Sequence, residues 1–187
     1  AFERALRGPV VTTLARGLGA AVLFQDHVIS KPPSTAAEVG WHQDYAYWPL
    51  SAPRGVTLWV ALDDADEENG CLRYLPGTHL LGERRAADFT RGAAQPARAD
   101  LPPIDAGARA SEAVAVPLSA GEAVLHDPLV WHMSPPNRST RPRRAWSITL
   151  VAEDVRWDPE HAPHPYVWSL SPRAGAPLDP ARFPRLA

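Results

Sequence analysis

Apolar residues recur at every fourth position at the start of the chain, which is the spacing of one helical face. These positions are Phe2, Leu6, Val10, Leu14 and Leu18. Gly17 and Gly19 supply a stop signal, because glycine is favoured just past the ends of helices. The pattern predicts one short amphipathic helix.

Beyond this helix, short segments rich in apolar and β-branched residues are separated by clusters of Gly, Pro, Asp and Asn, which is typical of strands and turns. The predicted strands are Ala20–Ile29, Gly55–Leu62, Cys71–Leu75, Ala113–Leu118, Glu122–His126 and Ala145–Ala152. No second strong helix is predicted between them. Many short strands favour an all-β sandwich or barrel over alternating βαβ units.

Two stretches depart from this pattern. Residues from about Leu80 to Ser111 are rich in Ala, Arg, Asp and Pro without a clear period, so we expect a long insertion between strands. Loops of that length are often functional lids. From Arg156 onward, prolines and aromatic residues predict an extended segment that lies over the body of the domain.

Composition narrows the functional classes. Nineteen basic residues against 21 acidic ones argue against a nucleic-acid binder, because phosphate contacts demand a positive excess. The single cysteine, Cys71, excludes an intramolecular disulfide and a cysteine-based zinc cluster. No apolar run approaches the length of about 20 residues that crosses a bilayer. We therefore expect a cytoplasmic protein that binds neither nucleic acid nor membrane.

His42-Gln43-Asp44 places an imidazole and a carboxylate two residues apart, on one face of an extended backbone and within reach of a single ion. The triplet alone is weak evidence, because any of the seven histidines could precede an acidic residue by chance. A second histidine would complete a facial triad of two histidines and one carboxylate, which leaves positions on iron open. Both His126 and His132 are candidates.

The sequence after His132 favours it over His126. A basic run from Arg141 to Arg144 follows, and a planar guanidinium can hold the far carboxylate of an iron-chelating keto acid by two hydrogen bonds. We expect His126 to be a partly buried histidine on the same wall of the domain.

Six motifs carry a family resemblance across most of residues 20–150. They are Lys31-Pro32-Pro33, Trp41-His42-Gln43-Asp44, Trp59-Val60-Ala61-Leu62-Asp63-Asp64, Glu68-Asn69-Gly70-Cys71-Leu72, Leu75-Pro76-Gly77-Thr78-His79 and His132 through Asn137. In this order they resemble the phytanoyl-CoA dioxygenase family. The resemblance implies a mainly-β fold with a double-stranded β-helix (jelly-roll, cupin-like) core that binds iron(II) and 2-oxoglutarate.

The resemblance also assigns residues. It makes His42, Asp44 and His132 the iron ligands. Arg143, eleven residues after the second histidine, becomes the partner of the distal carboxylate of 2-oxoglutarate. The remaining predicted cosubstrate contacts are Ser134, which matches a hydroxyl residue at that carboxylate, Trp59, whose alternative is simple core packing, and His27, which matches a pocket position.

The reaction that this resemblance implies is hydroxylation of a small organic substrate by O2, with release of succinate and carbon dioxide. In related halogenating enzymes a small residue replaces the carboxylate, so Asp44 favours hydroxylation. The alternatives are a non-catalytic jelly-roll metal-binding module and a triad iron oxygenase that does not use 2-oxoglutarate.

We expect residues 1–187 to form one domain that lacks part of the family's N-terminal region, since the chain opens with Ala directly in the helical pattern. The sequence leaves the oligomeric state open. The identity of the substrate is equally open, because fold and family do not determine it.

Overall fold

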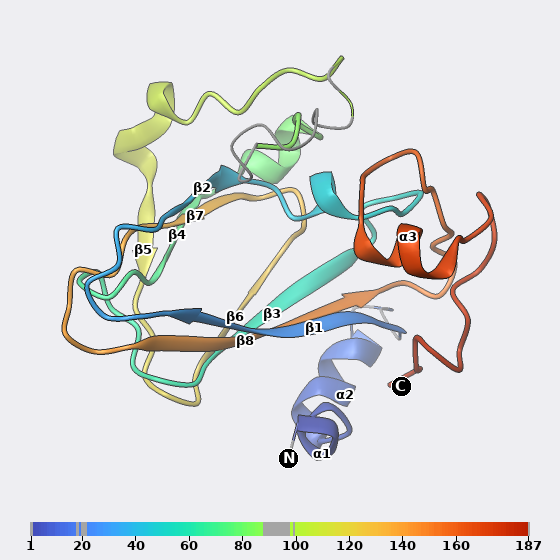
Figure 1. The fold of residues 1–187 in the computed structure, drawn as a ribbon, viewed down its shortest axis with the longest axis horizontal. Helices are drawn as coiled ribbons and strands as arrows, with labels where there is room; N and C mark the ends of the chain where they lie inside the picture. Colours follow the sequence, from blue (N-terminus) through green and yellow to red (C-terminus); the bar gives the residue numbers. More distant parts are fainter. Residues whose placement is uncertain (1, 18, 20–21, 88–97, 99, 187) are drawn as a thin grey trace.

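The computed structural model of the protein describes residues 2–17, 19, 22–87, 98 and 100–186, and in them two four-stranded antiparallel sheets face each other (Figure 1). The first sheet has the order β1-β8-β3-β6, with β1 Val22–Lys31, β8 Arg143–Val151, β3 Gly55–Ala61 and β6 Ala123–His126. The second has the order β2-β7-β4-β5, with β2 Val39–His42, β7 Trp131–Ser134, β4 Leu72–Leu75 and β5 Val114–Val116. The expected mainly-β architecture is confirmed.

The N-terminal part forms two short helices, α1 (Phe2–Leu6) and α2 (Pro9–Gly17), where the sequence pattern predicted one. The break falls at Gly8-Pro9, because proline has no N–H to donate and suits the first turn of a new helix. Leu18 lies outside the described residues. No helix in the described ranges is long and apolar enough to cross a membrane.

Both helices cover the outer face of the first sheet (Figure 1). Alternation along β8 turns Trp146, Ile148 and Leu150 to this face and Arg143, Ala145 and Ser147 to the space between the sheets. The outward residues pack against the helices in a cluster of Leu6, Val11, Ala15, Leu58, Trp146, Ile148, Leu150 and Leu186. The N-terminal helices therefore cover the outer face of β8, and its inner face lines the space between the sheets.

The described ends of the predicted insertion lie over the outer face of the second sheet. A 3-10 helix stands at each of its two boundaries, η2 (Thr78–Leu81) and η3 (Gly107–Glu112). Just before η3, Ala106 and Ile104 pack on Leu75 and Trp131. The middle of the insertion, 88–97 and 99, lies outside the described residues, so a lid function stays a prediction.

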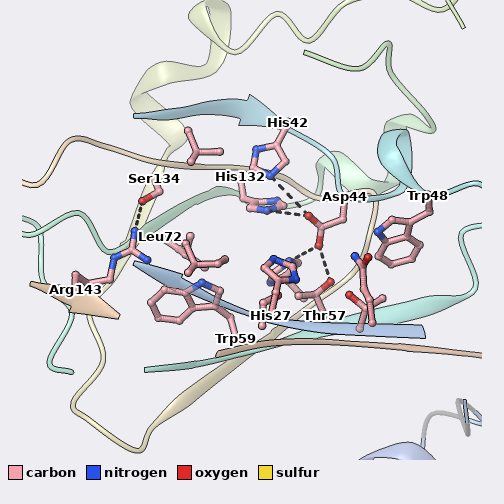
Figure 2. A pocket seen from close by; sticks show the side chains of 16 residues that line it. His27, His42, Asp44, Trp48, Thr57, Trp59, Leu72, His132, Ser134 and Arg143 are labelled. Atoms are coloured by element: carbon pink, nitrogen blue, oxygen red, sulfur yellow. Dashed lines mark hydrogen bonds and ion pairs between the residues drawn. The ribbon is translucent and has the colours of Figure 1, made fainter. Parts of the chain in front are cut away.

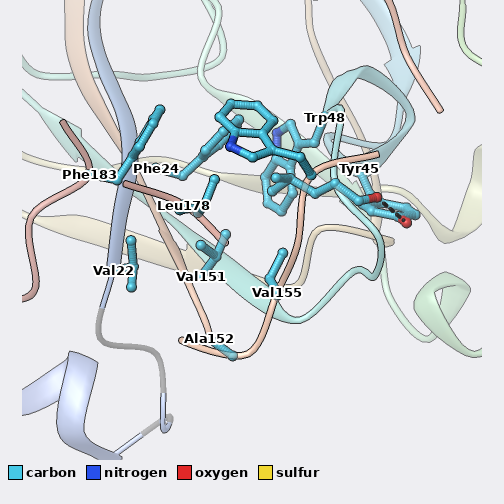
Figure 3. Packing of buried hydrophobic residues seen from close by; sticks show 11 residues of the cluster. Val22, Phe24, Tyr45, Trp48, Val151, Ala152, Val155, Leu178 and Phe183 are labelled. Atoms are coloured by element: carbon cyan, nitrogen blue, oxygen red, sulfur yellow. Dashed lines mark hydrogen bonds between the residues drawn. The ribbon is translucent and has the colours of Figure 1, made fainter. Parts of the chain in front are cut away.

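The C-terminal part closes one end of the two sheets. It includes α3 (Pro165–Leu170), a helix where the sequence predicted an extended segment. Proline suits the first position of a helix, which Pro165 occupies. The His164 side chain caps the helix by accepting a hydrogen bond from the Tyr166 N–H. The cluster that the C-terminal part joins, drawn in Figure 3, consists of Val22, Phe24, Tyr45, Trp48, Leu50, Val151, Ala152, Val155, Trp157, Leu178 and Phe183. Tyr45 begins a 3-10 turn, η1 (Tyr45–Tyr47), next to the candidate site.

Candidate metal centre

The predicted metal ligands meet where β2 lies beside β7. His42, the last residue of β2, pairs with His132 of β7, and Asp44 follows immediately before η1. Because residues directly opposite on antiparallel strands share a face, the two imidazoles meet with ring centroids 4.1 Å apart. One potential ligand atom from each of the three residues lies within 4.8 Å of the others. Figure 2 shows the three side chains converging.

Backbone carbonyls orient both histidines. Nδ1 of His42 lies 2.9 Å from the carbonyl oxygen of Gly40, and Nδ1 of His132 lies 3.1 Å from that of Val130. A carbonyl oxygen can only accept, so Nδ1 carries a proton in each ring, and in the neutral form of each ring Nε2 presents a lone pair. This arrangement is typical of metal-binding histidines.

The two oxygens of Asp44 have different partners. Oδ2 accepts a hydrogen bond of 2.6 Å from the Thr57 hydroxyl and lies 3.1 Å from Nε2 of His126. Oδ1 faces Nε2 of His42 at 3.7 Å and Nε2 of His132 at 3.4 Å. The carboxylate therefore offers one oxygen to the point where both imidazole lone pairs converge.

His126 is more than a neighbouring wall residue. Its side chain is buried, with 7% of the residue exposed, and it joins the Asp44 carboxylate to the hydroxyl of Tyr74, which lies 2.9 Å from Nδ1. His126 is not among the three residues whose ligand atoms converge. His126 thus lies on the wall of the same cavity, as predicted, but it is buried where partial burial was expected, and it contacts Asp44.

Opposing influences set the charge of this cluster. Burial alone would raise the pKa of Asp44, but His132 and His126 hold it well below its usual range. Burial alone would lower the pKa of His132, yet the Asp44 charge raises it. Burial, together with His132, lowers the pKa of His42 to about 3. Asp44 is therefore an anion and His42 a neutral imidazole, as metal ligands require.

Arg143 is a buried cation at another part of the same cavity (Figure 2). Only 1% of the residue is exposed, and its guanidinium lies over the ring of Trp59, 5.2 Å from the centroid. Burial lowers its pKa to about 10. Within the described part of the chain no carboxylate pairs with it, and its Nε has no hydrogen-bond partner. A buried cation without a counter-ion is costly, which suggests that a bound anion completes the site.

Ser134 orients this arginine. Its hydroxyl accepts a hydrogen bond of 2.7 Å from Nη2 of Arg143 and donates one of 3.0 Å to the carbonyl oxygen of Gly70. The adjacent Arg144 points outward and pairs with Asp63 at 2.7 Å. Strand alternation thus turns the two arginines to opposite faces of the sheet.

The three candidate ligands and Arg143 line one cavity of about 220 Å³ between the sheets. Its wall includes the other two predicted cosubstrate contacts, Trp59 on β3 and His27 on β1. His27 lies opposite Ser147 of β8, which also lines the cavity. The chemistry of the donors fits both expected groups: two imidazoles and a carboxylate suit iron, and a free guanidinium suits a dicarboxylate.

Sequence reasoning missed Thr57, Tyr74 and the contact of His126 with Asp44. Thr57 lies two residues before Trp59 on β3, and a polar residue at an inward position of an apolar strand is a signal for such a role. Lys31, quoted only as part of a motif, is also buried and donates to the carbonyl oxygens of Ser134 and Pro135.

The fold and the site together define a double-stranded β-helix, or jelly-roll, with a candidate metal centre between its sheets. The chain belongs to the phytanoyl-CoA dioxygenase family, since the family profile described as Phytanoyl-CoA dioxygenase (PhyH) matches residues 2–145. The predicted family is therefore confirmed.

Individual proteins agree with this assignment. Phytanoyl-CoA dioxygenase domain-containing protein 1 of Danio rerio is 32% identical over 171 residues, which cover 86% of this chain and 56% of that protein. The α-ketoglutarate-dependent epimerase SnoN, solved with Fe3+, α-ketoglutarate and nogalamycin RO, is 28% identical with a TM-score of 0.76, over 100% of this chain and 73% of SnoN. The carbocyclase SnoK is 26% identical with a TM-score of 0.72, over 95% of this chain and 66% of SnoK. The chain spans about half the length of the curated relatives that it matches.

Proposed function

We propose that this protein is an iron(II)- and 2-oxoglutarate-dependent dioxygenase, which uses O2 to hydroxylate a small organic substrate and releases succinate and carbon dioxide. The observation that carries this proposal is the buried guanidinium of Arg143, which pairs with no carboxylate of the described residues and lines the same cavity as His42, Asp44 and His132. A metal site without oxoacid chemistry has no need of such a cation.

In this proposal His42, Asp44 and His132 hold the iron through two Nε2 atoms and one carboxylate oxygen. Three protein ligands on one face leave the other positions for the oxoacid and oxygen. The bound iron and oxoacid supply the oxidising power for attack on the substrate.

The other side chains position the reactants. Arg143 binds the distal carboxylate of 2-oxoglutarate, and Ser134 holds the guanidinium in place. Trp59 covers the guanidinium and keeps water from it, which strengthens the ion pair. His27 lines the same cavity from β1 and would face the cosubstrate there.

Anaerobic addition of iron(II) and 2-oxoglutarate tests this proposal through the visible metal-to-ligand charge-transfer band. We expect the parent to give the band and His132→Ala to abolish it. Arg143→Ala should keep the band but weaken oxoacid affinity by about 30-fold or more, since losing one partner of a buried charge pair costs about 2 kcal/mol or more. The matched control is Arg144→Ala, which removes an exposed arginine one residue away and should bind as the parent does.

Other results point elsewhere. A band that survives His132→Ala but vanishes in His126→Ala would mean that His126 is the second ligand. Iron binding without any oxoacid band would favour the triad oxygenase that does not use 2-oxoglutarate. Formation of the band without succinate release, over a panel of candidate substrates, would favour a non-catalytic module.

Hydroxylation itself needs a product measurement, because the similar solved structures include an epimerase and a carbocyclase. We expect label from 18O2 to appear in the product, together with one succinate per turnover. Succinate release with an unlabelled epimer or cyclised product would replace hydroxylation by one of those outcomes.

We also propose that residues 1–187 form one domain. Leu186, near the C-terminal end, packs in the same cluster as Leu6 and Val11 of the N-terminal helices. Both ends of the chain therefore support the sheet that carries Arg143.

A further inference from the structure

Two neighbouring strands deliver two donors to the same oxygen of Asp44. Thr57 of β3 pairs directly with His126, the last residue of β6. Side chains directly opposite on an antiparallel pair lie on the same face, so both reach the carboxylate that follows β2 in the facing sheet. Their contacts with Oδ2 measure 2.6 Å for the hydroxyl and 3.1 Å for Nε2.

The direction of each hydrogen bond follows from its partner. An ionised carboxylate only accepts, so Nε2 of His126 carries the proton and donates to Asp44. Nδ1 of the same neutral ring must then accept, and the partner 2.9 Å away is the hydroxyl of Tyr74, which donates to it. Tyr74 thereby selects the tautomer of His126 that can hold Asp44.

This arrangement decides how many carboxylate oxygens a metal meets. Two donors occupy Oδ2 and fix the plane of the carboxylate, while Oδ1 alone faces the imidazoles of His42 and His132. Without the donor from His126, the single hydrogen bond from Thr57 would no longer fix the plane of the carboxylate, which could then rotate and offer both oxygens to the metal. A second oxygen would take a coordination position that the oxoacid or oxygen needs.

We propose that Tyr74 and His126 form a positioning pair, in which Tyr74 sets the tautomer of His126 and His126 holds Asp44 as a metal ligand through one oxygen. The inference rests on the proposed function, because it concerns the metal that His42, Asp44 and His132 would bind. Neither member of the pair touches the metal; each acts through the next residue.

Cobalt(II) is a suitable probe, because its visible d–d bands report both affinity and coordination number without turnover. The titration compares the parent with His126→Leu, His126→Gln, Tyr74→Phe and the double variant His126→Leu/Tyr74→Phe. Glutamine can place an N–H donor where Nε2 of the histidine lies, whereas leucine fills the space without one. His79→Leu, which removes an imidazole outside the cavity, is the matched control, and His42→Ala defines loss of the site.

We expect His126→Leu to bind cobalt(II) about 10- to 100-fold more weakly than the parent, the usual effect of losing a partner behind a metal ligand. Its d–d bands should shift as the carboxylate binds through two oxygens, and His126→Gln should restore both affinity and spectrum. Tyr74→Phe should shift both in the same direction by less. The double variant should match His126→Leu, since Tyr74 acts only through His126. His79→Leu should behave as the parent does.

Three results would overturn the inference: parent-like binding and spectrum in His126→Leu, no recovery in His126→Gln, or additive losses in the double variant. If His126→Leu fails to fold by circular dichroism, Tyr74→Phe decides, because it removes one hydroxyl and retains the ring. A parent that binds no better than His42→Ala would instead overturn the proposed function, and the inference with it.

Discussion

Single buried residues carry most of the chemistry of this site, and Lys31 shows how burial changes a proton equilibrium. The residue is 5% exposed, and its amine donates to the carbonyl oxygens of Ser134, at 2.7 Å, and of Pro135. Burial and the nearby charge of Arg143 lower its pKa to about 8. Lys31 thus holds the end of β7 near Arg143, and its charged form is destabilised there by burial and by the charge of Arg143.

This shift predicts a pH-dependent contribution to stability. Between the folded pKa of about 8 and the unfolded value of 10.5, the unfolded chain binds the extra proton, so the contribution of Lys31 to folding rises with pH. We expect the difference in unfolding free energy between the parent and Lys31→Met, from urea denaturation, to grow from pH 7.5 to pH 9.5. A difference that stays constant over this range would contradict the lowered pKa.

At the same scale, the family motifs identified the residues that meet in the cavity, but not the contacts between them. His42, Asp44 and His132 could be selected because their motifs are specific in combination. The sequence does not show which residues Thr57 and Tyr74 contact, because β3 and β4 reach the candidate ligands only through the pairing of strands. The assignment of His42, Asp44 and His132 as metal ligands remains a prediction that metal titration can test.

At the scale of elements, the strands rich in β-branched residues were predictable, and the short strands that carry His42 and His132 were not. β2 and β7 have four residues each and end beside turns or prolines, so no alternating pattern develops. β8 begins at Arg143, two residues earlier than predicted, because it continues its ladder with β1 as far as Lys31. Pairing with a neighbour extended this strand beyond what its own residues indicate.

The turn before β4 constrains the surroundings of Arg143 through Gly70. This glycine has a φ of +90°, and a Cβ there would lie 2.6 Å from the carbonyl oxygen of Pro135. Its own carbonyl oxygen accepts from Ser134, which holds Arg143. Close packing at this turn is therefore connected to the guanidinium.

We expect Gly70→Ala to destabilise the protein more than Gly121→Ala does. Gly121 has a nearly equal φ of +91°, but a Cβ there meets nothing within 4 Å, so its substitution costs only the backbone strain of about 1–3 kcal/mol. Urea denaturation of both variants isolates the clash as the difference. Equal losses would show that the Pro135 loop moves away freely.

At the scale of the whole molecule, the C-terminal part supplies residues of the core. Phe183 is 4% exposed and stacks on Phe24 of β1 with ring centroids 6.0 Å apart, while Trp157 meets it edge-on. The sequence predicted a segment over the body of the domain. The sequence could not indicate that Phe183 packs on Phe24, because scattered prolines and aromatic residues have no regular spacing that would show which of them face the core.

Phe183→Ala should lower the free energy of unfolding by about 3–5 kcal/mol, the usual cost of removing a buried aromatic ring. Trp168→Ala is the control, since 71% of that residue is exposed and its loss should change stability by less than about 0.5 kcal/mol. Thermal and urea unfolding of both variants give the comparison. Similar effects at the two positions would mean that the C-terminal part is only loosely attached.

The candidate site also draws on both sheets at once. His42 and His132 come from the β2-β7-β4-β5 sheet, whereas Arg143 comes from β8 in the sheet opposite. An oxoacid that contacts both a metal and Arg143 would link the two sheets across the interior. Its binding free energy would add to the free energy of unfolding of the whole domain. Filling the cavity and keeping the two layers together would then be one and the same thermodynamic event.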